Sequence, residues 1–198
     1  MRLSVSVTAL SVIALLATLS GCATDSLATD FGGGAAAKYT DDSGLPVIIL
    51  ASKRTTAIDF TGTTVDGAKL RASDSRGLVT VVNFWYANCA PCRAEAPFLR
   101  GLNEKYRAAG VKFIGVNIFD QSVAAASFEK KFDIGYPSVM DVDSGAARIA
   151  FAGAVAPTAT PTTFVLDARG RIAARIVGQL ESESILNTLI SDTLAESK

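Results

Sequence analysis

Two cysteines separated by two residues, Cys89 and Cys92, constrain this chain more than any other feature. They follow an apolar run, residues 78–85, whose continuity predicts a strand buried on both faces. The stretch after them, residues 93–109, is compatible with a helix. The spacing therefore predicts that Cys89 lies where a buried strand passes into a helix.

A thiol in this position is suited to disulfide exchange. The first turn of a helix carries unpaired backbone N–H groups and the positive end of the helix dipole, and both favour a thiolate. Cys92 comes one turn later, near enough to displace a partner that Cys89 has captured. We therefore expect Cys89 to be the exposed nucleophile and Cys92 the resolving thiol.

Half of a structural zinc site is the alternative interpretation of the pair. Zinc takes four ligands, typically Cys or His. The chain contains no histidine, and its one other cysteine, Cys22, lies near the start. The composition therefore favours a redox pair and predicts no metal site.

The strand, Trp85, the sequence Cys89-Ala90-Pro91-Cys92 and the following helix together resemble the thioredoxin superfamily. Within it the chain resembles the extracytoplasmic TlpA/ResA-like, or DsbE-type, thiol–disulfide oxidoreductases, from about Thr56 to the C-terminus. The resemblance implies an α/β, thioredoxin-like fold. Its central mixed β-sheet is flanked by helices, and it carries an N-terminal β-hairpin and an inserted helix.

Two further positions carry the resemblance. Pro161, in the stretch 159–167, matches the family's cis-proline before a strand, and Pro157 is the competing candidate. A cis-proline here would present the backbone of Thr160 to an extended substrate segment. Glu95, three residues after Cys92, matches a functional glutamate of the ResA-like branch.

The chain departs from the family pattern before the first cysteine and within the strand. Asn88 stands where the family usually has Trp or another bulky residue. Asn83 stands where thioredoxin has a buried aspartate, and since an amide takes no proton, Glu95 becomes the candidate proton acceptor for Cys92. The alternative is a solvated glutamate that pairs with Arg93 or Lys105.

Two residues near the cysteines are expected to support the site. Pro91 lacks an N–H and has a fixed φ, which suits the first turn of a helix. Trp85 is expected to pack beneath the active-site loop.

The N-terminus predicts export. Arg2 precedes an apolar run that ends in Leu19-Ser20-Gly21-Cys22, which indicates a secretory signal over residues 1–21. The last four residues resemble the bacterial lipobox, so Cys22 is the predicted lipidation site. An uncleaved anchor helix with an incidental Cys22 is the alternative. Both place the domain outside the cytoplasm and hold it at a membrane.

The rest of the chain divides into a tether and one domain. Residues 22–44 are rich in small and polar residues and predict a flexible tether, and residues 45–198 suit a single domain. With 19 basic and 19 acidic residues, the chain gives no indication of a nucleic-acid partner. The expected elements are a hairpin (57–62 and 68–71), strands at 111–118 and 136–141, helices at 121–132, 145–152 and 181–194, and a second hairpin (162–167 and 172–178).

These observations predict a membrane-tethered, extracytoplasmic thiol–disulfide oxidoreductase without a cofactor. Its expected partners are cysteine-containing exported proteins and a membrane electron-transfer partner. The resemblance, together with the uncharged Ala90-Pro91 spacer, favours reduction of exported proteins, apocytochrome c among them, and hence a role in cytochrome c biogenesis.

Three alternative functions remain. The opposite direction, disulfide formation in exported proteins, uses the same pair of cysteines. A thiol peroxidase of related fold fits less well, because that chemistry uses a Thr-x-x-Cys setting and position 86 is Tyr. A redox-inert, peptide-binding lipoprotein would leave the cysteine pair without a role.

Overall fold

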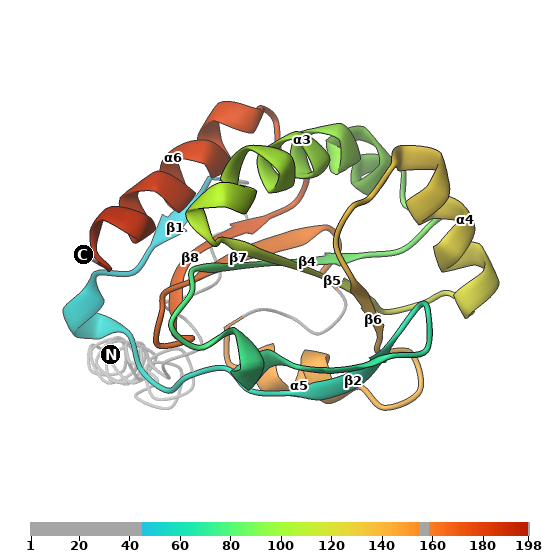
Figure 1. Cartoon of the computed structure of the whole chain (residues 1–198), viewed down its shortest axis with the longest axis horizontal. Helices are drawn as coiled ribbons and strands as arrows, with labels where there is room; N and C mark the ends of the chain where they lie inside the picture. The colour runs from blue at the N-terminus through green and yellow to red at the C-terminus, as the bar shows by residue number, and fades with distance from the viewer. Residues whose placement is uncertain (1–44, 155–158, 198) are drawn as a thin grey trace, which may run out of the picture. The chain divides into compact units, whose positions relative to one another are not determined.

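The computed structural model describes residues 45–154 and 159–197. Its centre is an eight-stranded mixed sheet in the order β1-β8-β7-β4-β5-β6-β2-β3 (Figure 1). The strands are β1 (Val47–Ile48), β2 (Thr61–Thr64), β3 (Lys69–Arg71), β4 (Thr80–Trp85), β5 (Lys112–Asn117), β6 (Ser138–Met140), β7 (Thr162–Leu166) and β8 (Ile172–Val177). The α-helices are α3 (Ala90–Tyr106), α4 (Ser122–Phe132), α5 (Ala146–Phe151) and α6 (Glu183–Ala195). The predicted thioredoxin-like α/β fold is confirmed.

Strand β4 lies in the middle of the sheet, and each of its six residues is buried. It runs parallel to β5, to which α3 connects it, and antiparallel to β7. Successive side chains point to opposite faces of a strand. The apolar residues of β4 therefore serve two separate cores, which explains why the strand is a continuous apolar run.

Helices cover both faces of the sheet (Figure 1). On one face α3 and α6 pack through Leu99, Leu102 and Leu186 against Val81 of β4. On the other face α5 packs through Phe151, whose ring lies edge-on to Phe84 of β4 with 5.2 Å between centroids. The sheet thus holds β4, and the cysteines that follow it, between two apolar layers.

Helix α4 is the inserted element, placed between β5 and β6. It presents Phe128 and Ala125 to a third apolar cluster, which contains Trp85, Cys89 and Cys92. The insertion therefore forms part of the wall around the cysteine pair.

The N-terminal hairpin is formed by β2 and β3, as predicted, but its first strand is shorter than expected. The sequence indicated a strand from residue 57, whereas β2 begins at Thr61. Ile58 and Phe60 instead contribute to the core beneath α5, and the backbone N–H of Ile58 donates to the carbonyl of Gly170 rather than to a hairpin partner.

Several predictions fall outside the described residues. The predicted signal (residues 1–21), Cys22 and the predicted tether (residues 22–44) all lie within residues 1–44, and Pro157 lies within residues 155–158. Within the described part of the chain, every helix is too short or too polar to span a bilayer.

Candidate active site

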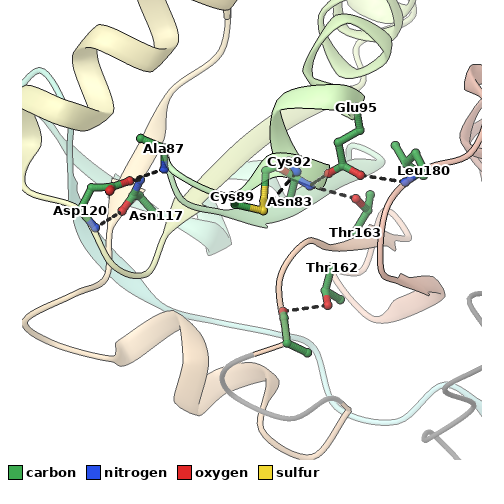
Figure 2. Close-up of a disulfide and its surroundings, with 11 residues drawn as sticks. Asn83, Ala87, Cys89, Cys92, Glu95, Asn117, Asp120, Thr162, Thr163 and Leu180 are labelled. Atoms are coloured by element: carbon green, nitrogen blue, oxygen red, sulfur yellow. Dashed lines mark hydrogen bonds between the residues drawn. A yellow bond between two sulfur atoms is a disulfide. The ribbon is translucent and has the colours of Figure 1, made fainter.

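Cys89 and Cys92 are joined by a disulfide at the start of α3, with 5.2 Å between their Cα atoms (Figure 2). Cys89 is the N-cap residue, and its Sγ accepts a hydrogen bond of 3.1 Å from the backbone N–H of Cys92. Pro91 occupies the second position of the helix, where its missing N–H leaves no intrahelical bond unmade. The pair therefore lies at the predicted strand-to-helix junction.

The disulfide is almost fully enclosed, which the sequence did not predict. The exposed fraction is 2% for Cys89 and 2% for Cys92, so the expectation of an exposed Cys89 is wrong for this oxidised form. The reason is the apolar cluster around the pair, in which the ring of Trp85 stacks on Phe128 at 4.3 Å. Asn88 is the exposed neighbour.

Glu95 lies one turn beyond Cys92 on α3, and its side chain is completely buried. One carboxylate oxygen accepts a hydrogen bond of 2.8 Å from Nδ2 of Asn83, and the other accepts one of 2.8 Å from the backbone N–H of Leu180 (Figure 2). No residue in the described part of the chain forms an ion pair with it. The solvated glutamate considered from the sequence is therefore excluded.

This environment sets the protonation of Glu95. Burial disfavours the charged form and raises the pKa of Glu95 to about 7, against the opposing effect of the hydrogen bonds from Leu180 and Asn83. Near neutral pH the carboxyl group therefore exists in both forms and can take up and return a proton. Asn83 also donates to Oγ1 of Thr163 at 3.1 Å, which fixes the amide between the helix and β7.

Pro161 forms a cis peptide bond with Thr160. Thr162, the next residue, pairs with Phe84 of β4, so Pro161 lies at the end of the sheet from which the cysteines emerge. Pro161 is buried and Thr160 is half-buried. The segment with the cysteine pair and the segment with Pro161, both predicted to form the site, thus lie at the same end of the sheet.

A polar brace that the sequence did not reveal holds the loop before Cys89. The carboxylate of Asp120 accepts hydrogen bonds from the backbone N–H of Ala87 at 2.5 Å and from Nδ2 of Asn117 at 2.7 Å (Figure 2). Oδ1 of Asn117 accepts in turn from the backbone N–H groups of Phe119 and Asp120. The available signal was the position of these polar residues at the end of β5, because parallel strands β4 and β5 end at the same edge.

Comparisons with known proteins agree with this geometry. Residues 26–190 match the Redoxin family. The chain belongs to the Redoxin family. The thiol-disulfide oxidoreductase ResA of Geobacillus kaustophilus is 33% identical over 130 residues, which cover 66% of this chain and 72% of that protein.

Solved structures give the same result. A thiol:disulfide interchange protein of the thioredoxin family from Chlorobium tepidum matches with a TM-score of 0.66 and 29% identity, covering 73% of this chain and 99% of the other. A secreted thiol-disulfide isomerase from Corynebacterium glutamicum matches with a TM-score of 0.69 and 26% identity, covering 79% and 95%. This Redoxin family member is a thiol–disulfide oxidoreductase of the ResA/DsbE type with a Cys89–Cys92 pair.

Proposed function

We propose that this oxidoreductase is tethered to the outer face of the cell membrane and reduces disulfides of exported proteins, with apocytochrome c among its targets. The observation that carries its exchange chemistry is the buried carboxyl group of Glu95, one turn from Cys92, with a pKa of about 7. This group supplies the proton acceptor that the resolving cysteine needs at neutral pH.

The reaction begins with the reduced pair. The thiolate of Cys89 attacks one sulfur of the substrate disulfide, and the other substrate sulfur leaves as a thiolate that takes a proton from water. Glu95 accepts the proton of the Cys92 thiol, and the Cys92 thiolate attacks Sγ of Cys89. The Cys89–Cys92 disulfide forms, the second substrate thiolate leaves, and two electrons have passed to the substrate. A membrane electron donor then reduces the pair.

The direction of electron flow is inferred from the residues between the cysteines. Ala90 and Pro91 carry no charge or imidazole that would strongly stabilise the Cys89 thiolate. A weakly stabilised thiolate favours an intermediate or reducing couple over a strong oxidant. The resemblance to the ResA-like branch, which Glu95 and Pro161 carry, implies the same direction.

The location is inferred from the N-terminal sequence. Leu19-Ser20-Gly21-Cys22 follows an apolar run, and a related structure is described as secreted. We propose residues 1–21 as the signal, Cys22 as the lipidated residue, residues 22–44 as the tether and residues 45–198 as the catalytic domain. Mass spectrometry of the membrane fraction should find a diacylglyceryl group on Cys22, and Cys22→Ala should release the protein from the membrane.

The reduction potential of the pair tests the direction. The Cys22→Ser protein is equilibrated with dithiothreitol and glutathione buffers, with Cys89→Ser and Cys92→Ser as controls that form no intramolecular disulfide. A potential near −270 mV, roughly that of thioredoxin, supports a reductase. A potential near −120 mV, roughly that of a strong oxidant, would assign the protein to disulfide formation instead.

A further inference from the structure

A large aromatic side chain lies exposed beside the cysteine pair. Phe119, in the segment between β5 and α4, is 73% exposed. Its ring lies 5.6 Å from that of Tyr86, three residues before Cys89. We call Phe119 and Tyr86 the aromatic surface. None of the steps of the exchange reaction described above uses it.

The position of the aromatic surface relative to Cys89 is fixed by hydrogen bonds. The carbonyl of Tyr86 accepts from the backbone N–H of Cys89 at 3.2 Å, and the next residue, Ala87, donates to Asp120. On the other side, Asn117 holds the backbone of Phe119. The backbone of Phe119 and the loop before Cys89 are thus both held, and Tyr86, whose ring faces Phe119, packs against the apolar cluster that contains the cysteine pair.

An exposed aromatic group in a rigid setting is suited to binding. Aromatic residues are enriched in protein interfaces because they bury a large apolar area at a small cost in side-chain entropy. Val123, four residues after Phe119 and in the first turn of α4, is also exposed, at 78%. Both apolar side chains belong to the segment that begins at the braced end of β5.

We propose that the aromatic surface binds an apolar side chain next to the target cysteine of an unfolded polypeptide. The occupant must be continuous with the cysteine that reaches Cys89, because the surface adjoins the pair. An unfolded chain fits best, because it exposes apolar side chains that a folded protein buries. This proposal rests on the thiol–disulfide exchange activity and adds a substrate class to the proposed function.

Two disulfide-bonded peptides that differ at one position test the proposal. Each has the same pair of cysteines, with either Leu or Ser next to the first cysteine. Reduced full-length protein is mixed with each peptide, and oxidation of the pair is followed by fluorescence of Trp85, the one tryptophan of the chain. We expect the Leu peptide to react about tenfold faster, since burial of about 50 Å² of apolar surface has this effect.

Substitutions connect this preference to Phe119. Phe119→Ser should bring the ratio of the two rates close to one, and Phe119→Leu should retain most of it. Ile149→Ser is the matched control, because Ile149 is 74% exposed but lies on α5, across the sheet from α3. It should leave the ratio unchanged.

Peptide binding by the aromatic surface and the reducing direction of electron flow are tested by different experiments. Equal rates for the two peptides with the wild-type protein would contradict the proposal that the aromatic surface binds an apolar side chain. An unchanged preference in Phe119→Ser would contradict it as well. A loss of exchange with dithiothreitol in Phe119→Ser would also overturn it, because the effect would then be general. A strongly oxidising potential would overturn the reductase function and leave the peptide preference standing.

Discussion

Two buried carboxylates, Asp167 and Glu95, lie near opposite ends of the central sheet and have opposite surroundings. Asp167, directly after β7, accepts hydrogen bonds from the guanidinium groups of Arg171 and Arg54 at 2.8 and 3.3 Å. Burial alone would raise the pKa of Asp167, but the hydrogen bonds and charge of Arg171 and the bond from Arg54 outweigh it and lower the pKa. At the cysteine end, Glu95 is more deeply buried and has no cationic partner in the described part of the chain.

The difference separates a structural carboxylate from a reactive one. Asp167 stays charged at any moderate pH and joins the turn before β8 to Arg54. Glu95 receives neutral donors alone, so burial dominates and its pKa is about 7. A charge that must be present is paired with cations, whereas a proton that must move is held by neutral groups.

Removal of the structural carboxylate should have the largest effect on stability. Asp167→Ala leaves the partly buried Arg171 without its carboxylate partner and leaves the buried Arg54 with only the exposed Glu196 as a partner among the described residues. We expect the free energy of unfolding in urea to fall by about 3 kcal/mol. The reduction potential should not change, and the exposed helix residue Asp192 provides the control, Asp192→Ala. A large shift in potential in Asp167→Ala would show that the two ends are coupled.

Glu95 should impose a pH dependence on stability with a defined sign. Its pKa is raised from 4.5 to about 7, so the folded protein binds the proton more tightly than the unfolded chain does. This stabilisation is fully present below pH 4.5 and is lost as pH rises through 7, a change of about 3 kcal/mol. Comparison of urea unfolding of the oxidised wild type and Glu95→Gln from pH 4 to 8 measures it. Parallel curves would show that Glu95 has an ordinary pKa.

The same substitution should slow resolution of the mixed disulfide. Glu95→Gln cannot accept the proton of Cys92, so release of a mixed disulfide on Cys89 should slow by about 100-fold at pH 7. The wild-type rate should rise with an apparent pKa near 7, and this step should disappear in the variant. Stopped-flow fluorescence of Trp85 follows the reaction. An unchanged pH profile would exclude Glu95 as the acceptor.

Asn83→Asp places a second carboxyl group beside Glu95. The amide that donates to Glu95 is lost, and two neighbouring carboxyl groups resist ionising together. We expect the upper apparent pKa of the pair to rise by about one unit, with the pH profile of resolution moving in the same direction. Asn83→Ser, which keeps a neutral donor, is the control and should shift the profile less.

The brace at Asp120 should give the smallest effect. Asp120→Ala leaves the backbone N–H of Ala87 without its acceptor and should lower the free energy of unfolding by about 1 kcal/mol. It should also weaken the preference for the Leu peptide, because Phe119 and Cys89 are then less firmly aligned. Asp120→Asn keeps an acceptor oxygen and should retain the preference. Equal preferences in the two variants would show that Asp120 does not align Phe119 with Cys89.

The sequence predicted those parts of the site that local patterns determine. The strand before Cys89, the helix after it and the hairpin of β7 and β8 follow from hydrophobic periodicity and turn residues, and all are present. The role of Glu95 was suggested by resemblance, but the contacts that bury it completely were not predicted. Its partner Leu180 is 85 residues away, so no local pattern records the contact.

The features that the sequence did not predict also depend on contacts between residues distant along the chain. The bond between Ala87 and Asp120 joins residues 33 apart, and that between Arg54 and Asp167 joins residues 113 apart. The enclosure of Cys89 depends on Phe128 of the inserted helix, whose packing partner the helical pattern alone does not identify. In each case the contact exists because the sheet brings together strands and loops that are distant along the chain.

The titration of Glu95 itself tests most directly whether this carboxyl group can accept the proton of Cys92. Carbon-13 NMR of the oxidised protein, labelled at the glutamate side-chain carboxyl carbon, follows each carboxyl group across pH 3 to 9, and Glu95→Gln assigns the resonance. We expect one glutamate with a midpoint near 7 that is absent from the variant. A midpoint near 4.5 for Glu95 would contradict the claim that this buried carboxyl group is the proton acceptor of Cys92.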